Sequence, residues 1–367
     1  MLYTTLFPGR YVQGSQALQS LGEEMKRLGK NALFILDPYV EKNIWPQMEN
    51  STLSEISVHL STFGGECSDK EIDKQVKAGK ENKIDIVAGI GGGKTLDAAK
   101  AVAHELAVPV AIIPTIASTD APCSALAVIY SQEGEFDRYL FLPKNPELVL
   151  VDSEIIANSP VRFLVSGMGD ALATWFEANS CRQSFAPNMS GNYGSNAAYT
   201  LAQLCYDTLI EEGLSAKRSV QAHAVTPALD HIIEANTLLS GLGFESGGLA
   251  AAHAIHNGLT ILQDTHHYYH GEKVAFGTLA SLFLTDKPRQ IVEQVYSFCE
   301  TIGLPTTLED IGLTNVTDYE LERVAERVCA EGETIHNEAL PVEPDMVTAA
   351  LKTADMEGQG RKNRTDY

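Results

Sequence analysis

The chain has 367 residues, of which 44% are hydrophobic and 20% are charged, the proportions of an ordinary soluble globular protein. Its 27 basic and 48 acidic residues give a formal net charge of −21, which argues against a nucleic-acid surface or an anionic membrane as partner. Six cysteines lie apart without C-x-x-C pairs, and we see no signal region or membrane-length apolar run, so we expect a cytoplasmic protein with reduced thiols.

Short apolar runs alternate with helical patterns in the first part of the chain, at residues 32–36, 84–90, 108–113 and 148–151. Such runs are typical of parallel strands covered by helices on both faces. After Ser159-Pro160, a suitable cap and first position for a helix, alanine- and leucine-rich stretches dominate. We therefore expect an α/β nucleotide-binding domain over residues 1–159 and an all-helical, metal-binding domain over residues 160–367, with ligands in the cleft between them.

An acidic residue, Asp37, directly follows the first apolar run. An acid at a strand end beside an adenosine ribose favours a free 2′-hydroxyl, and therefore NAD over NADP. The alternative is a turn residue, because Asp37 precedes Pro38 and this pair favours turns.

A glycine-rich turn, Gly91-Gly92-Gly93, separates the second apolar run from a helix-like stretch that begins at Thr95. Glycines let backbone N–H groups approach a ligand, and a helix N-terminus favours phosphate. The turn matches neither standard motif, because a P-loop needs glycine at Ala88 and the dinucleotide fingerprint needs glycine at Lys94. It predicts a nucleotide-like ligand, and a tight turn that binds nothing is the alternative.

A segment of small and hydroxyl-bearing residues, 114–124, follows the third apolar run. It would lie at the carboxyl end of the sheet, where open α/β folds bind ligands. Its hydroxyls could hold a cofactor, and Asp120 could accept a hydrogen bond from a substrate hydroxyl. Taken alone, the segment also fits a plain connecting loop.

Five of the ten histidines fall within 18 positions: His253, His256, His266, His267 and His270. Two imidazoles from neighbouring elements and one carboxylate would form a three-ligand site with open positions, the arrangement of catalytic zinc. Asp170, set among glycine, alanine and leucine, is a candidate for the carboxylate, although a helix N-cap is its other interpretation. The histidines could also be ordinary helix and loop residues.

Taken together, these segments resemble the iron- or zinc-dependent polyol dehydrogenase family, which is related in fold to dehydroquinate synthase. The most similar stretches are 89–100, 114–130, 169–175, 239–258, 270–278 and 331–337. The resemblance covers essentially the whole chain. The tail after Asp355, with Arg361, departs from the family pattern, and we expect a solvated end there.

The resemblance implies that Asp170, His253 and His270 bind one zinc ion, with iron as the other candidate. Iron-type relatives carry a further histidine four residues after the aspartate, where this chain has Thr174, as in the glycerol-type branch. Three protein ligands leave room on zinc for two adjacent hydroxyls of a polyol. The roles of His256, His266 and His267 stay open.

The resemblance also implies contacts with NAD and with substrate. The expected catalytic and substrate-binding residues are Asp120, Asp170, His253 and His270. The expected cofactor contacts, to which we add Lys94 and Asp97 of the glycine turn and its helix, are Asp37, Gly91, Gly92, Lys94, Asp97, Thr115, Ser118, Ser124, Leu126 and Tyr130.

The implied activity is metal-dependent oxidation of glycerol to dihydroxyacetone with hydride transfer to NAD, in a homo-oligomer such as an octamer. The same chemistry on another 1,2-diol or alcohol is the alternative. Phosphorylated substrates are disfavoured because few cations flank the expected ligands, where Lys273 stands alone. A metal- and nucleotide-binding sensor without catalysis is the non-enzymatic alternative.

Overall fold

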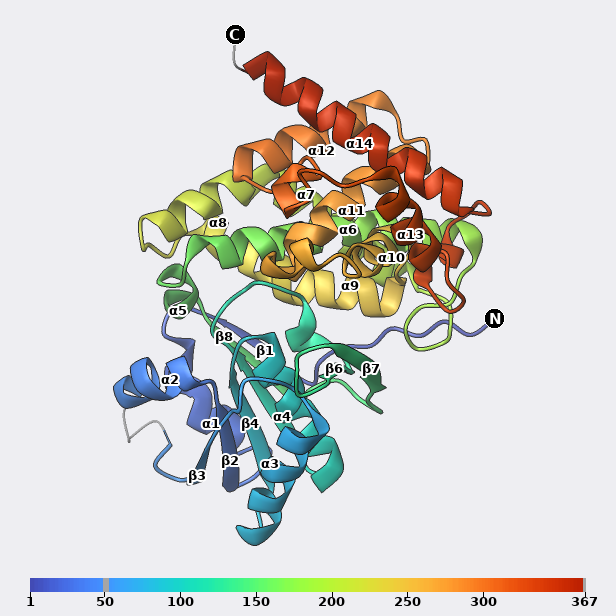
Figure 1. The fold of residues 1–367 in the computed structure, drawn as a ribbon. Coiled ribbons are helices and arrows are strands. Elements are labelled where there is room, and N and C mark those ends of the chain that lie inside the picture. The colour runs from blue at the N-terminus through green and yellow to red at the C-terminus, as the bar shows by residue number, and fades with distance from the viewer. Residues whose placement is uncertain (49–52, 366–367) are drawn as a thin grey trace. The chain divides into compact units, whose positions relative to one another are not determined.

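The computed structural model describes residues 1–48 and 53–365. The chain forms two compact units, coloured along the chain in Figure 1. A sheet unit contains residues 6–163 and 218–241, and a helical unit contains residues 1–5, 164–217 and 242–367. The chain passes from the sheet unit into the helical unit after residue 163, whereas the sequence predicted a division after residue 159. Residues 1–5 belong to the helical unit and residues 218–241 to the sheet unit, so neither unit is one continuous segment as expected.

The sheet unit is built on six parallel strands in the order β1-β8-β5-β4-β2-β3. Phe34 and Ile86 on one face pack with Leu21 and Met25 of α1, and alternate residues such as Leu33 are also buried. Both faces are therefore covered, as expected for continuous apolar strands. The strands are β1 (Tyr11–Gly14), β2 (Asn31–Leu36), β3 (Ser57–Thr62), β4 (Ile86–Gly91), β5 (Val110–Pro114) and β8 (Leu148–Asp152).

Helices join these strands, and an antiparallel pair, β6 (Leu126–Tyr130) and β7 (Phe136–Phe141), forms a second small sheet. The helices of this unit are α1 (Leu21–Met25), α2 (Pro38–Asn43), α3 (Asp69–Glu81), α4 (Gly93–Leu106), α5 (Ser153–Ala157) and α8 (Pro227–Glu234). The short 3-10 turns are η1 (Ala17–Ser20), η2 (Trp45–Gln47) and η3 (Ala121–Cys123), and a π-helical turn, η4 (Ala235–Leu239), continues α8.

Long helices make up the second unit, in agreement with the expected fold class. None of the helices in the described ranges combines the length and apolar character needed to cross a bilayer. The elements are α6 (Val161–Ser184), α7 (Asn196–Gln221), α9 (Ser240–Gly247), α10 (Ala251–Leu259), η5 (Gln263–His267), α11 (His270–Leu284), α12 (Arg289–Ile302), η6 (Glu309–Ile311), α13 (Asp318–Val328), η7 (Thr334–Asn337) and α14 (Pro344–Thr365).

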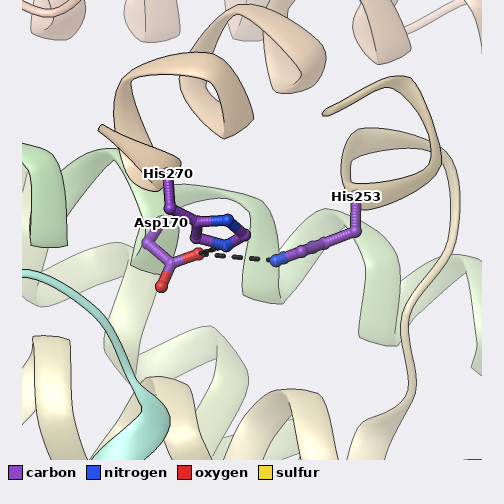
Figure 2. Close-up of side chains that lie close together, drawn as sticks. All are labelled: Asp170, His253 and His270. Atoms are coloured by element: carbon purple, nitrogen blue, oxygen red, sulfur yellow. Dashed lines mark ion pairs between the residues drawn. The ribbon is translucent and has the colours of Figure 1, made fainter. Parts of the chain in front are cut away.

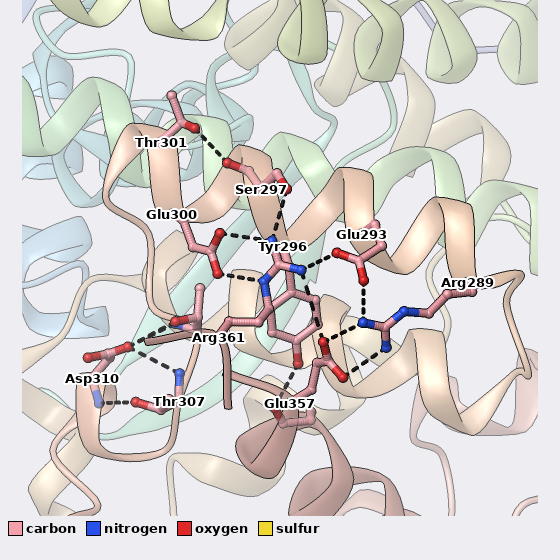
Figure 3. Close-up of polar contacts among 12 residues, drawn as sticks. Arg289, Glu293, Tyr296, Ser297, Glu300, Thr301, Thr307, Asp310, Glu357 and Arg361 are labelled. Atoms are coloured by element: carbon pink, nitrogen blue, oxygen red, sulfur yellow. Dashed lines mark hydrogen bonds and ion pairs between the residues drawn. The ribbon is translucent and has the colours of Figure 1, made fainter. Parts of the chain in front are cut away.

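The tail after Asp355 is part of α14, and Gln359, Gly360, Lys362 and Asn363 are exposed as expected for a solvated end, but Arg361 is not. Arg361 forms a two-pronged pair with Glu300 of α12, with N–O distances of 2.6 and 2.9 Å, and also pairs with Glu293 (Figure 3). Its guanidinium lies 5.5 Å from the ring centroid of Tyr296, and its side chain is only 12% exposed. Acidic partners on α12, which are far away in sequence, therefore hold Arg361 against this helix.

Candidate metal and nucleotide sites

Three candidate ligands come together in the helical unit from three different helices. Asp170 lies in the interior of α6, His253 in the first turn of α10, and His270 at the start of α11. The N-cap interpretation of Asp170 is therefore wrong. The carboxylate is almost fully buried, whereas both imidazoles are partly buried.

The donor atoms of these residues converge on one point (Figure 2). Asp170 Oδ1 lies 3.2 Å from His270 Nε2 and 3.4 Å from His253 Nε2, and one ligand atom from each residue lies within 4.8 Å of the others. Ligands about 2.0–2.2 Å from zinc at tetrahedral angles lie about 3.3–3.6 Å apart. The donor types and their spacing thus fit a divalent cation.

Glycines allow the three helices to approach closely enough for this convergence. A Cβ on Gly169 would lie 2.4 Å from the carbonyl oxygen of Gly271, and one on Gly271 would lie 1.8 Å from that of Ser166. A Cβ on Gly277 would likewise lie 2.5 Å from the carbonyl oxygen of Ala252. Because Asp170, His253 and His270 are each next to one of these contacts, the helix crossings fix the ligand positions.

Asp170 and His253 stabilise each other's charged forms. Burial opposes ionisation of Asp170, but the charges of His270 and His253 and their hydrogen bonds outweigh it, so the pKa of Asp170 lies well below its usual range. Burial likewise opposes protonation of His253, yet Glu177 and Asp170 raise its pKa well above the ordinary value. A metal cation would take over the role of the imidazole protons.

Two further residues contact the imidazoles of His270 and His253. Only one of them, His256, was considered a possible site residue from the sequence. His256 is buried and its Nε2 lies 3.1 Å from His270 Nδ1; burial, followed by the charges of His270 and Lys273, lowers its pKa. Glu177, which sequence reasoning missed, places Oε2 2.6 Å from His253 Nδ1. Its seven-residue spacing from Asp170, two helical turns, was the available signal.

The two remaining histidines of the predicted cluster lie apart from the ligand atoms. His266 and His267 are exposed in η5, and His266 Nε2 lies 2.8 Å from the carbonyl oxygen of Thr260. Neither belongs to the group that could hold an ion.

The glycine turn in the sheet unit lies where the strand order changes direction. β2 and β4 are neighbours, but the chain runs outward from β2 to β3 before it returns to β4. Open α/β folds bind ligands at the carboxyl ends of such strands. A Cβ on Gly91 would lie 2.9 Å from the Cβ of Asp37, and Gly92 begins α4 without a side-chain cap. The structure thus brings Asp37, Gly91 and Gly92 together.

A cavity of about 1410 Å³ opens at this edge of the sheet unit. Its lining includes Asp37, Tyr39, Gly92, Thr115 and Ile116. Asp37 also caps α2, because its Oδ1 accepts a hydrogen bond of 2.8 Å from the Tyr39 N–H. Asp37 therefore caps the helix after the turn, as its turn interpretation suggested, and also lines the cavity.

Other predicted cofactor residues surround α4. Lys94 pairs with Glu66 and lies 4.9 Å from the ring centroid of Tyr130, at the end of β6. Asp97 is buried, pairs with Lys100 at 2.9 Å, and accepts the Val128 N–H at 3.0 Å. These contacts give the buried carboxylate of Asp97 a structural role. Lys100 also donates to the carbonyl oxygen of Leu126.

The hydroxyl-rich segment is held by the π-helical turn and the residue that follows it. Asp120 is buried and accepts a 2.7 Å hydrogen bond from Ser240, and Asn236 donates to the carbonyl oxygen of Ala117 at 3.0 Å. Thr115 donates its N–H to Gly91, which links this segment to the glycine turn. Ser118 is half-buried, and the buried Ser124 donates its hydroxyl to the Ala121 carbonyl oxygen.

Comparison with known proteins shows which family the chain belongs to. Residues 8–153 match the model of the iron-containing alcohol dehydrogenases. The chain is 62% identical to a glycerol dehydrogenase of Thermotoga maritima over 100% of both chains, and 47% identical to a glycolaldehyde reductase of Halobacterium salinarum over 97% and 98% of the two chains. The solved glycerol dehydrogenase of Schizosaccharomyces pombe has a TM-score of 0.93 at 40% identity and covers 100% of this chain and 93% of its own.

Both the identities and the lengths covered show homology along the whole chain. The chain is an oxidoreductase that belongs to the iron-containing alcohol dehydrogenase family, in the branch that contains the glycerol dehydrogenases.

Proposed function

We propose that the protein oxidises glycerol at C2 to dihydroxyacetone and transfers the hydride to NAD. The observation that carries this proposal is the convergence of Asp170, His253 and His270, with ligand atoms within 4.8 Å. The relative at 62% identity is a glycerol dehydrogenase. The balanced reaction converts glycerol and NAD⁺ to dihydroxyacetone, NADH and a proton.

We assign the cation, zinc or iron, to Asp170, His253 and His270. When bound there, it would polarise the substrate hydroxyl groups, and the nicotinamide would accept the hydride. The chain's own contribution is a fixed, anionic donor set in which one buried carboxylate balances part of the cation's charge. Asp120, held by Ser240, would accept a hydrogen bond from a substrate hydroxyl and so orient the polyol.

The glycine turn and its surroundings would bind the dinucleotide. The first N–H groups of α4 point along the helix axis from Gly92 and suit the pyrophosphate. Asp37 would accept hydrogen bonds from the ribose hydroxyls. We keep Lys94, Thr115, Ser118, Ser124, Leu126 and Tyr130 as further contacts, and Asp97 as a residue that acts through Lys100 and the backbone of β6.

A second candidate function follows from the relative that is named a glycolaldehyde reductase. Reduction of a small 2-hydroxy aldehyde uses the same donor set in the reverse direction. We rank it below glycerol oxidation because that relative is 47% identical, against 62% for the glycerol dehydrogenase. A cytoplasmic homo-oligomer is also part of the proposal.

The test is NADH formation by the purified protein with glycerol, 1,2-propanediol, ethanol and glycerol 1-phosphate, and NADH oxidation with glycolaldehyde. Each assay is run on untreated protein, after chelation, and after separate addition of zinc or iron. We expect glycerol to give the highest kcat/KM, activity to disappear on chelation, and zinc to restore it. Faster turnover of glycerol 1-phosphate or glycolaldehyde would reject the substrate, and full activity after chelation would reject the metal.

A further inference from the structure

Glu177 is a buried carboxylate that contacts a proposed metal ligand in two ways. It lies on α6, two turns after Asp170, and is 1% exposed. Its Oε1 accepts the backbone N–H groups of Ala250 and His253, both at 2.9 Å, and its Oε2 lies 2.6 Å from His253 Nδ1. One side chain therefore contacts both the backbone and the imidazole of His253.

The bond at Nδ1 determines which imidazole nitrogen is available to a metal. An ionised carboxylate can only accept hydrogen bonds, so the proton of this contact belongs to His253 Nδ1. In the neutral imidazole that a metal requires, the lone pair then lies on Nε2, the atom that faces Asp170 at 3.4 Å. We propose that Glu177 is a positioning residue for the metal site, which holds His253 in the tautomer and ring orientation that present Nε2 to the cation. This inference rests on the proposed metal site.

The same contacts also have a structural explanation, because the N-cap residue of α10, Ala250, provides no side-chain cap. Glu177 supplies acceptors for two of its N–H groups, and Glu338 accepts a third, from Ala251, at 3.1 Å. Both acids are buried and cap the same helix, but Glu177 also contacts the imidazole of His253. Glu338 is therefore the matched control for the capping role.

The substitution Glu177→Gln separates capping from positioning. If the amide oxygen replaces Oε1, both backbone hydrogen bonds are kept, but the NH₂ group faces Nδ1 and favours a proton on Nε2. If the amide is turned over, the Nδ1 contact is kept and the NH₂ group meets two backbone N–H donors. Since the second arrangement leaves donors facing donors, we expect the first, which blocks the metal-binding nitrogen.

The experiment measures zinc affinity directly, by competition with a chromogenic chelator, on metal-free wild type, E177Q and E338Q. Thermal unfolding of the metal-free proteins measures the capping contribution in parallel. We expect E177Q to bind zinc about 10- to 100-fold more weakly than wild type, and E338Q to bind it within about threefold. We also expect the two variants to unfold at similar temperatures without metal.

Three results would overturn the inference. E177Q could bind zinc as tightly as wild type, or E338Q could lose as much affinity as E177Q, which would leave only capping. Absence of zinc binding by wild type would reject the metal site and this inference with it. A wild-type protein that binds zinc but does not oxidise glycerol would contradict only the proposed reaction. If E177Q does not fold, Glu177→Asp provides the test, because it still only accepts hydrogen bonds and should retain more than half of the wild-type zinc sites at saturation.

Discussion

Single residues of the candidate metal site differ in what they contribute, and His253 combines the most contacts. Its Nε2 faces Asp170, its Nδ1 faces Glu177, and its backbone N–H is bound to the same glutamate. Removing the imidazole leaves Asp170 as a buried carboxylate with one histidine fewer to balance its charge. Such a loss is far more costly than loss of an exposed imidazole.

We therefore expect His253→Ala to lose bound metal and to lower kcat by about 1,000-fold or more, because a bound cation supplies several kcal/mol of transition-state stabilisation. Metal analysis after dialysis and NADH formation measure the two effects. His266→Ala, at an exposed position bound to Thr260, is the control and should retain both. A His253→Ala protein with full metal content would remove this residue from the ligand set.

Asp37 combines a structural contact and a proposed specificity contact, which two substitutions can separate. Asp37→Asn keeps a good N-cap for the Tyr39 N–H but removes the negative charge that disfavours a 2′-phosphate. We expect D37N to unfold near the wild-type temperature and to lose much of the preference for NAD over NADP, measured as the ratio of kcat/KM values. Asp37→Ala should change that ratio similarly and also destabilise by about 1 kcal/mol. An unchanged ratio in both variants would leave Asp37 a helix cap alone.

The sequence pointed to ligand residues better than to the residues that support them. Asp170 was a candidate because an acid among small apolar residues is poorly placed for a solvated surface, but nothing local distinguished a ligand from an N-cap. Glu177 was missed because its partners, at residues 250 and 253, lie more than 70 positions away. The distinction of His256 from His266 likewise depends on burial, which only the packed helices determine.

Among the elements, four strands were predicted from apolar runs. Two of these runs begin two residues before the observed strand, and the difference has a local cause. The runs begin at Ile84 and Val108, whereas β4 and β5 begin at Ile86 and Val110. The N–H groups of Ile84 and Val108 bond to Gly79 and Ala103, in the last turns of the preceding helices. These apolar residues close helix ends before the strand starts.

The edge strands were not predicted, because they bury too little apolar surface to give a continuous run. β3 forms one edge of the sheet, and its six residues are exposed or half-buried. β1 forms the other edge and is half-buried throughout. An apolar run indicates burial on both faces, so it marks central strands and leaves edge strands unmarked.

The crossing of α6 and α11 is an element-scale contact that the metal site requires. Gly271→Ala would place a methyl group 1.8 Å from the Ser166 carbonyl oxygen, which forces the helices apart. We expect a destabilisation of about 1–3 kcal/mol or more, together with weaker metal binding, because Asp170 and His270 flank this crossing. Denaturant unfolding and metal titration measure the two effects.

The control for the glycine substitution lies on α14. An added Cβ at Gly360 meets no atom within 4 Å, so Gly360→Ala should stabilise the helix by about 0.5–1 kcal/mol and leave metal binding unchanged. If Gly271→Ala were as well tolerated as Gly360→Ala, the close crossing would not be needed to hold the ligands.

The contact between α12 and α14 is a second element-scale feature that can be tested. Arg361→Met keeps an alkyl chain over Tyr296 but removes the pairs with Glu300 and Glu293. We expect a loss of no more than about 1 kcal/mol at pH 7, because the guanidinium pair is two-pronged but its acidic partners are a third or more exposed. Denaturant unfolding measures it. A variant as stable as wild type would show that the pairs with Glu300 and Glu293 contribute nothing measurable to folding.

At the scale of the whole molecule, acidic groups outnumber basic ones, and many of the acids are stabilised in their charged form. The hydrogen bond from Arg138 lowers the pKa of Asp69 in the sheet unit, and in the helical unit hydrogen bonds from Arg361 and Arg289 lower the pKa values of Glu293 and Glu357 respectively. Burial raises the pKa of Glu338, which acts in the opposite sense. Among the carboxylates whose pKa departs from its usual value, lowered values outnumber raised ones.

This excess of lowered pKa values determines how the stability of the folded protein changes with pH. A carboxylate with a lowered pKa in the folded state contributes stability above its unfolded pKa, about 3.9–4.3, and loses it as the pH falls through the folded value. We therefore expect the unfolding temperature of metal-free protein to fall steadily between pH 5 and pH 3, as followed by circular dichroism. The difference between wild type and Arg361→Met should shrink over the same interval, because Glu293, whose pKa is lowered by its hydrogen bond with Arg361, becomes protonated in both. A difference that stays constant down to pH 3 would mean that the stabilisation by Arg361 does not depend on the charge of Glu293.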